Sequence, residues 1–209
     1  QASNASATLP AVTLQTALAQ AMERNPGLRA AQQAVAASEG AMIQSQARPN
    51  PELAFSQEDT RRATRSSSLQ WNQPIEVGGK RAARMRVAEH GVELARAELD
   101  TTRAALRADV RTAFVNLLAA QQRVQLNEKT LQIAAQARDA AAKRVIAGKA
   151  APLEETKAQV AESSAQLALN QAQSGLRVAR QQLALLWGGT GLAVGEAMGD
   201  MDQLPQMPP

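Results

Sequence analysis

The chain has 209 residues, of which 44% are hydrophobic but only 2% aromatic, and it contains no cysteine and one histidine. The lack of cysteine excludes disulfides and thiolate metal sites, and the scarcity of large side chains argues against a bulky globular core. The formal net charge of +4 is spread along the chain and only weakly indicates an anionic partner, and no apolar run is long enough to predict a transmembrane helix.

The chain begins with small polar residues and continues with two helices. Residues 1–12 are predicted to be disordered. The segment 13–48 has apolar residues at helical spacing, with Thr13 as a possible N-cap of the first helix. Asn25 is expected to cap the second helix, and Pro26 suits its first position because the missing N–H would have no helical partner there.

The segment 49–77 has the period of a β-hairpin. Its apolar residues alternate with polar ones in two runs, Leu53 and Phe55 in the first and Leu69, Trp71, Ile75 and Val77 in the second. The polar stretch 57–66 is the predicted loop, and each strand is expected to have about 8–11 residues, enough to cross a bilayer when tilted. One apolar and one polar face suit lipid outside and water inside. The pattern alone, however, favours an ordinary hairpin with one face on a core, because strands of this length are common.

The segment 78–189 is predicted to be one long antiparallel helical hairpin. From Lys80 to about Ala147 nothing interrupts the helical pattern, which gives roughly 100 Å of helix. Gly148 suits the residue after a helix end, and Pro152 can open a second helix that reaches about residue 187. The second helix carries leucines at seven-residue steps, Leu169, Leu176 and Leu183.

The tip of this hairpin is predicted at 145–153. The remaining tail, 190–209, is rich in Gly, Pro and Met and is predicted to be a linker.

No group of residues in the sequence predicts catalysis, a cofactor or a metal centre, so the chain is not expected to be an enzyme. His90 has Glu89 and Glu93 nearby, but a lone histidine on a charged helix face is more often solvated than a metal ligand. Three tail methionines are interpreted as linker residues rather than copper ligands, namely Met198, Met201 and Met207.

Four motifs in this order resemble one known family. They are TLQTALAQAMERNPGLRAAQQAVAASEGAMIQSQARPNPEL, QPIEVGGKRAARMRVAE, KRVIAGKAAPLEETKAQV and LALLWG, which together span residues 12–189. The order resembles the outer-membrane factors of tripartite efflux pumps, the TolC-like family. The joint at 73–84 looks most like the heavy-metal, cobalt–zinc–cadmium (Czc-type) branch.

The resemblance implies a mainly α fold, with a long antiparallel helical hairpin, shorter N-terminal helices and a two-stranded β-hairpin that joins a trimeric outer-membrane β-barrel. Members of the family carry two such repeats, whereas this sequence resembles the first one only. We therefore expect a truncated or processed fragment, with 190–209 leading towards a second repeat.

By resemblance, the function is that of an outer-membrane channel component, a passive duct that exports heavy-metal cations or drugs. The implied partners are a periplasmic adaptor (membrane fusion protein), an inner-membrane RND-type cation/proton antiporter, two further copies in a homotrimer, and outer-membrane lipid. The implied location is the outer membrane of a Gram-negative bacterium, with the helices in the periplasm.

The resemblance also suggests two contact surfaces. The adaptor is expected to contact the tip, at Val145, Ile146, Ala147, Gly148, Lys149, Pro152 and Leu153. The barrel residues expected to face lipid or to lie at the membrane–water interface are Leu53, Phe55, Leu69, Trp71 and Ile75. The alternatives are a plain helix–helix turn at the tip and ordinary packing of the β-hairpin.

Two alternative functions are less consistent with the sequence. A soluble coiled-coil adaptor or scaffold of the periplasm also has long helical hairpins, but the sequence contains no lipoyl-like β-rich segment around them. Nucleic-acid binding is disfavoured because the arginines alternate with Glu and Asp instead of forming a basic stripe.

Overall fold

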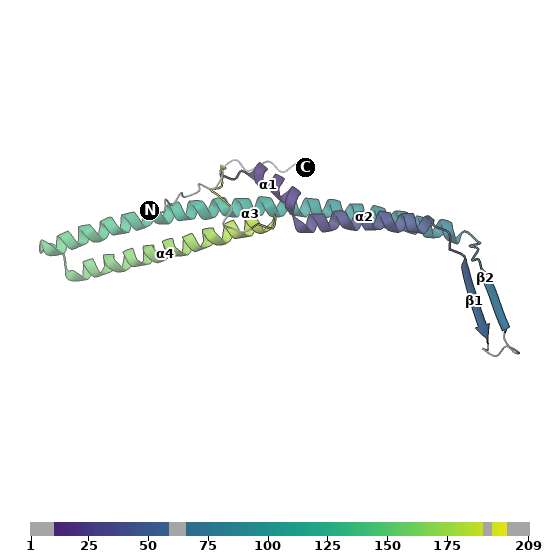
Figure 1. The fold of residues 1–209 in the computed structure, drawn as a ribbon. Coiled ribbons are helices and arrows are strands. Elements are labelled where there is room, and N and C mark those ends of the chain that lie inside the picture. The colour runs from purple at the N-terminus through teal and green to yellow at the C-terminus, as the bar shows by residue number, and fades with distance from the viewer. Residues whose placement is uncertain (1–10, 59–65, 190–193, 200–209) are drawn as a thin grey trace, which may run out of the picture. The chain divides into compact units, whose positions relative to one another are not determined.

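The computed structural model describes residues 11–58, 66–189 and 194–199 (Figure 1). Its elements are α1 (Leu14–Arg24), α2 (Pro26–Gln46), β1 (Glu52–Glu58), β2 (Ser66–Asn72), α3 (Lys80–Ile146) and α4 (Pro152–Leu185). The predicted fold class is confirmed, with long antiparallel helices, shorter N-terminal helices and one two-stranded antiparallel sheet. No helix in the described ranges is both long and apolar enough to cross a membrane.

The chain divides into two compact units. One contains residues 1–29 and 102–209, and the other contains 30–101. The 67-residue helix α3 runs through both without interruption, as the unbroken pattern predicts.

The two N-terminal helices begin at the residues that the sequence predicts. Thr13 is the N-cap of α1, and its side chain forms a capping box with Thr16. The side-chain oxygen of Asn25 accepts a 2.8 Å hydrogen bond from the Leu28 amide, which caps α2. The Asn25 side-chain nitrogen also donates a 2.7 Å bond to the Leu186 carbonyl, so this one residue ties the helix start to the end of α4.

The core of the first unit lies between α1, α3 and α4. Its most deeply buried side chains are small or aliphatic, namely Ala17, Ala21, Val110, Leu117, Leu183 and Ala184. Alanine at these positions lets the helix axes approach closely, which explains how a chain with so few aromatic residues still forms a packed core. Helix α4 runs antiparallel to the part of α3 that belongs to this unit (Figure 1).

Two segments that were predicted to be irregular pack on this core. Val12, assigned to the disordered start, and Ala197, assigned to the linker, form an isolated parallel β-bridge. Val194 is fully buried, and the Ala197 amide donates a 3.1 Å bond to the Gln121 side chain. The sequence missed this packing because small residues in a Gly- and Pro-rich stretch give no periodic signal. Residues 1–10, 190–193 and 200–209 lie outside the described residues.

In the second unit, α2 lies beside the start of α3, and the β-hairpin follows α2. Arg96 of α3 pairs with Glu39 of α2 at 2.8 Å. Each strand has seven residues, slightly shorter than expected, and most of the predicted loop lies outside the described residues.

Strand β2 ends five residues earlier than the alternating pattern suggests. The pattern continues through Ile75 and Val77, yet the strand stops at Asn72. Pro74 explains the difference because it has no N–H to donate to a neighbouring strand. Gln73 instead directs its side chain to the carbonyl of Pro74, at 3.2 Å.

Candidate functional site

The β-hairpin has one apolar and one polar face. Leu53 pairs with Trp71 and Phe55 with Leu69, so the four side chains share one face. They are between 66% and 72% exposed, and every residue of both strands is exposed in the single chain. Ile75, assigned to the same surface, lies beyond the strand. The hairpin thus carries an apolar surface that nothing in the described residues covers.

The opposite face of the hairpin is polar. Ser56 and Ser68 face each other there and are joined by a 2.7 Å hydrogen bond between their hydroxyls. The next pair on this face is Ala54 with Gln70. The strict alternation predicted from the sequence is therefore present as two faces of different chemistry.

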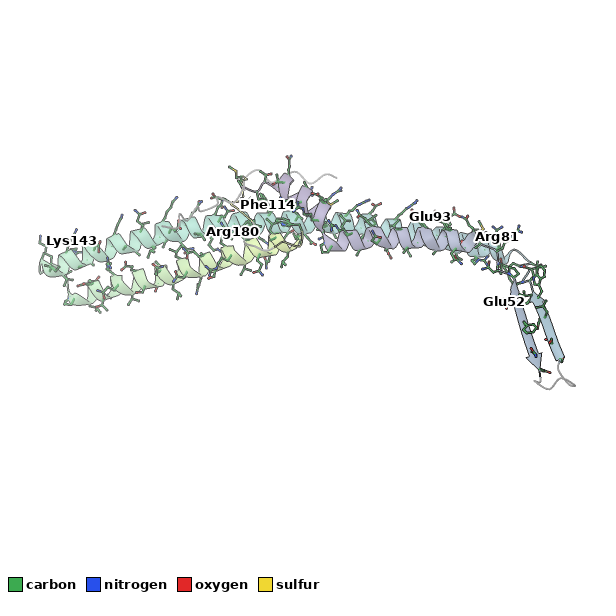
Figure 2. The ribbon with its side chains drawn as sticks, in the orientation of Figure 1. Glu52, Arg81, Glu93, Phe114, Lys143 and Arg180 are labelled. Atoms are coloured by element: carbon green, nitrogen blue, oxygen red, sulfur yellow. The ribbon has the colours of Figure 1, made fainter. Side chains whose placement is uncertain are left out.

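The joint between hairpin and helix is built on two glycines and two arginines. Gly78 and Gly79 both have φ of +75°, a conformation that is unfavourable for residues with a Cβ atom. Figure 2 shows Arg81 just beyond them, at the start of α3. Its Nη2 donates a 2.8 Å bond to the carbonyl of Gln46, the last residue of α2.

Arg84 extends this contact to the preceding residue of α2. Its Nε donates a 3.1 Å bond to the Ser45 carbonyl, and its terminal nitrogens bind both oxygens of Glu76. The last carbonyls of a helix lack helical partners and carry partial negative charge, so two guanidiniums satisfy them well. Hydrogen bonds from Arg84 hold the pKa of Glu76, which lies outside the two strands, below its usual value.

A glycine-to-alanine pair tests the backbone of the joint. Gly79→Ala should lower the free energy of unfolding by about 1–2 kcal/mol, because φ is positive although a Cβ would meet no atom within 4 Å. The matched control is Gly91→Ala in the interior of α3, where a Cβ is equally unobstructed and φ is helical; it should raise stability by about 0.5–1 kcal/mol. Denaturant unfolding of the full-length protein measures both. Equal effects of the two substitutions would contradict this account of the joint.

The turn between α3 and α4 lies where the sequence predicts it. Gly148 has φ of +69°, its amide donates to the Val145 carbonyl at 2.9 Å, and the Lys149 amide donates to the Arg144 carbonyl at 2.8 Å. This pair of bonds is the Schellman motif that ends many helices at glycine. Helix α4 then begins at Pro152 with two glutamates in its first turn.

The tip residues differ in the fraction of each side chain that is exposed. Ile146 is 85% exposed and Leu153 is 61% exposed, whereas Val145 is half-buried against the hairpin. The smaller residues Ala147 and Gly148 are also exposed. The predicted contact surface is therefore an open turn with two large apolar side chains, and its role stays a prediction.

An ion pair that the sequence reasoning missed joins α3 and α4 near the tip. Arg138 donates to Asp139 at 2.7 Å and pairs with Glu162 of α4 at 3.1 Å. The hydrogen bond to Asp139, followed by the charge of Glu162, raises the pKa of Arg138. Glu162 lies seven residues before Leu169, in the same seven-residue series as Leu176 and Leu183. This series could therefore have predicted a charged residue on the face of α4 that packs against α3.

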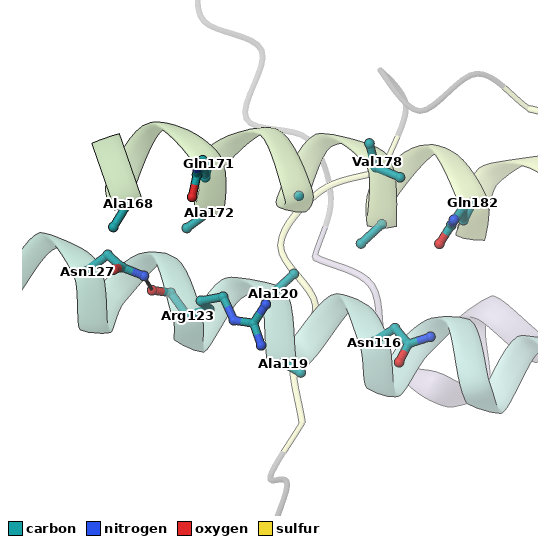
Figure 3. Close-up of a pocket in the computed structure, with 12 residues that line it drawn as sticks. Asn116, Ala119, Ala120, Arg123, Asn127, Ala168, Gln171, Ala172, Val178 and Gln182 are labelled. Atoms are coloured by element: carbon teal, nitrogen blue, oxygen red, sulfur yellow. Dashed lines mark hydrogen bonds between the residues drawn. The ribbon is translucent and has the colours of Figure 1, made fainter. Parts of the chain in front are cut away.

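A groove of about 600 Å³ runs between α3 and α4 (Figure 3). Small residues form much of its lining, namely Ala119, Ala120, Ala168, Ala172, Gly175 and Ala179. Its polar lining consists of side-chain amides and one guanidinium, that of Arg123. With a single titratable group, the groove offers hydrogen bonds but no acid–base pair.

His90 and the tail methionines, the candidate metal ligands of the sequence, belong to different parts of the chain. His90 lies 3.0 Å from Glu93 on an exposed face of α3. In the described ranges no three His, Cys, Asp or Glu side chains gather as a metal site. Met198 is exposed, while Met201 and Met207 lie outside the described residues.

Comparison with known proteins identifies the family. A family model described as "Outer membrane efflux protein" matches residues 17–189. The chain belongs to this family.

Two curated members are similar in sequence. The cobalt-zinc-cadmium resistance protein CzcC of Cupriavidus metallidurans is 45% identical over 197 residues, covering 94% of this chain and 47% of CzcC. The nickel-cobalt-cadmium resistance protein NccC of Alcaligenes xylosoxydans is 29% identical over 145 residues, covering 69% of this chain and 33% of NccC.

The present chain has the same fold as the part of a solved CusC structure that it matches. The TM-score is 0.79 at 18% identity, over 96% of this chain and 49% of that chain. The chain thus spans half or less of the length of the relatives it matches. Membership in the outer membrane efflux family confirms the predicted resemblance, and it agrees with the predicted location and with the expectation that the chain is not an enzyme.

Proposed function

We propose that this chain is part of the outer-membrane channel component of a tripartite efflux system, acting as a passive duct for heavy-metal cations. The observation that carries the proposal is the 45% identity to a cobalt-zinc-cadmium resistance protein over 94% of the chain. The duct itself performs no chemistry. Energy for export comes from an inner-membrane cation/proton antiporter of the RND type.

The β-hairpin is the part that enters the outer membrane. Two seven-residue strands leave unpaired edges on both sides, and unpaired backbone groups are costly in lipid. Pooling the strands of three chains in one closed barrel removes these edges. The apolar face, with Phe55 and Trp71, then faces lipid or its interface, and the polar face with Ser56 and Ser68 faces water.

The helical tip is the part that meets a periplasmic adaptor. Ile146 and Leu153 offer exposed apolar area on a turn whose backbone is fixed by the Schellman bonds around Gly148. A rigid turn loses little conformational entropy on binding, which suits a contact surface of this small size.

Metal resistance in a bacterial host tests the proposal. Deleting the full-length gene should lower the tolerated concentrations of cobalt, zinc and cadmium, and expressing it again should restore them, while resistance to an unrelated antibiotic that acts in the cytoplasm is the control. The protein should fractionate with the outer membrane as a trimer. Recovery in the soluble periplasmic fraction would instead support the adaptor or scaffold alternative and overturn the channel proposal.

A further inference from the structure

The joint between β2 and α3 is strongly basic. The segments 45–52 and 73–86 contain five cations, Arg48, Lys80, Arg81, Arg84 and Arg86. They contain only two carboxylates, Glu52 and Glu76. This imbalance contrasts with the alternating charges found elsewhere along the helices.

Only some of these cations are used by the fold. Arg81 and Arg84 bind the last carbonyls of α2, and Arg84 also takes up Glu76. Arg48 and Lys80 are exposed and form no ion pair with any described residue. The contacts within the fold therefore do not neutralise the positive charges of Arg48 and Lys80.

Backbone contacts hold these charges together. Nη2 of Arg84 lies 3.3 Å from the Ala47 carbonyl, which places Arg48, the next residue, beside the first turns of α3. Lys80 begins that helix, one residue before Arg81. We name these four residues, Arg48, Lys80, Arg81 and Arg84, the basic collar.

An open cavity of about 670 Å³ adjoins the basic collar. Two of its lining residues are Arg48 and Arg84, and much of the rest is apolar, namely Ala41, Ala47, Pro49, Val87 and Ala88. The guanidinium groups of this cavity match the phosphate of an anionic headgroup. The hydrocarbon chain of such a lipid belongs on the other side of the collar, against the hairpin. The exposed apolar face of the hairpin begins only a few residues away, at Leu53.

We propose that the basic collar binds the phosphate headgroup of an anionic phospholipid in the membrane leaflet at the helix-side end of the hairpin. The inference rests on the proposed function, which puts the hairpin in the membrane and the collar at its surface. Guanidinium matches phosphate in a bidentate way, and each cation near an anionic membrane surface adds about fivefold to binding. The lipid so held fixes the depth at which the barrel ends and the helical duct begins.

Native mass spectrometry of the full-length protein tests this inference. The protein is reconstituted with equal amounts of phosphatidylglycerol and phosphatidylcholine of identical chains, and retained lipids are counted. The wild type should retain phosphatidylglycerol preferentially. The double variant Arg48→Gln/Lys80→Gln, which leaves the Arg81 and Arg84 contacts intact, should lose between about fivefold and twenty-fivefold of this preference.

A matched control removes the same charge elsewhere on α3. Arg107→Gln/Arg111→Gln replaces two exposed cations more than twenty residues from the collar and should keep the wild-type preference. An equal loss in both variants would overturn the inference, because net charge alone would then explain it. Displacement of the lipid by inorganic phosphate at the same concentration would also overturn it, since the site would recognise free phosphate.

Insertion of the wild-type protein into lipid bilayers distinguishes a failure of this inference from a failure of the proposed channel function, on which it rests. A wild-type protein that enters bilayers but shows no preference for phosphatidylglycerol overturns the lipid site alone. A wild-type protein that enters bilayers of neither lipid overturns the proposed channel function as well. A double variant that enters bilayers but has lost its lipid preference supports the lipid site, and metal resistance of the wild type supports the channel function.

Discussion

An arginine in place of Leu69 should prevent the full-length protein from assembling in the outer membrane, whereas an arginine in place of Gln70 should not. Leu69 lies on the apolar face of β2, and Gln70, its neighbour, lies on the polar face. An arginine on the lipid face of a barrel costs about 2–4 kcal/mol near the bilayer centre, and a trimer bears this cost three times.

The measurement is the amount of trimer in outer-membrane fractions, together with cadmium resistance. Gln70→Arg is the matched control because it adds the same side chain to the same strand, one residue away. Assembly that suffers equally from both variants would mean that the two faces do not separate lipid from water. Normal assembly of Leu69→Arg would contradict a membrane location for the hairpin.

Gly148→Asp should abolish metal export while leaving the trimer in the membrane near its wild-type level. The residue has φ of +69° and no atom within 4 Å of a new Cβ, so the folding cost is backbone strain and an unfavourable helix-end charge, about 1–2 kcal/mol. A long hairpin tolerates this loss. A docked adaptor does not, because one unpaired buried charge costs several kcal/mol.

Two companion variants isolate the charge at the tip. Gly148→Asn accepts the left-handed conformation and has nearly the same shape without charge, so export should be reduced far less than in Gly148→Asp. Ala151→Asp is gentler than Gly148→Asp, because Ala151 is the N-cap of α4 and has no side-chain cap, which a carboxylate there can supply. If resistance falls only in proportion to protein level in every variant, the tip is a structural turn and not a contact surface.

The features that the sequence predicted correctly depend on neighbours within one or two turns of chain. Asn25 before Pro26 caps α2, and Gly148 before Pro152 marks the turn between long helices. Each of these effects is local, because a cap or a positive φ needs only a few adjacent residues. The alternation that defines the two hairpin faces is local in the same sense.

The features that the sequence did not predict depend on contacts between distant segments. Arg81 and Arg84 bind carbonyls 35 to 39 residues away, so no spacing in the sequence pairs them. Val194 is buried although its surroundings look like a linker. The predicted extension of β2 towards Val77 is absent for a local reason, because Pro74 interrupts the strand although the apolar alternation continues past it.

The distribution of buried residues along the helical hairpin has a consequence for its motion. No side chain between 119 and 168 is buried in the chain, whereas Val110, Leu117 and Leu183 are fully enclosed. Backbone amides in the half of the hairpin nearer the tip should therefore exchange hydrogen through partial openings, well before the whole protein unfolds. A partner that binds the tip suppresses the openings that begin there, so its arrival should slow amide exchange many residues up both helices.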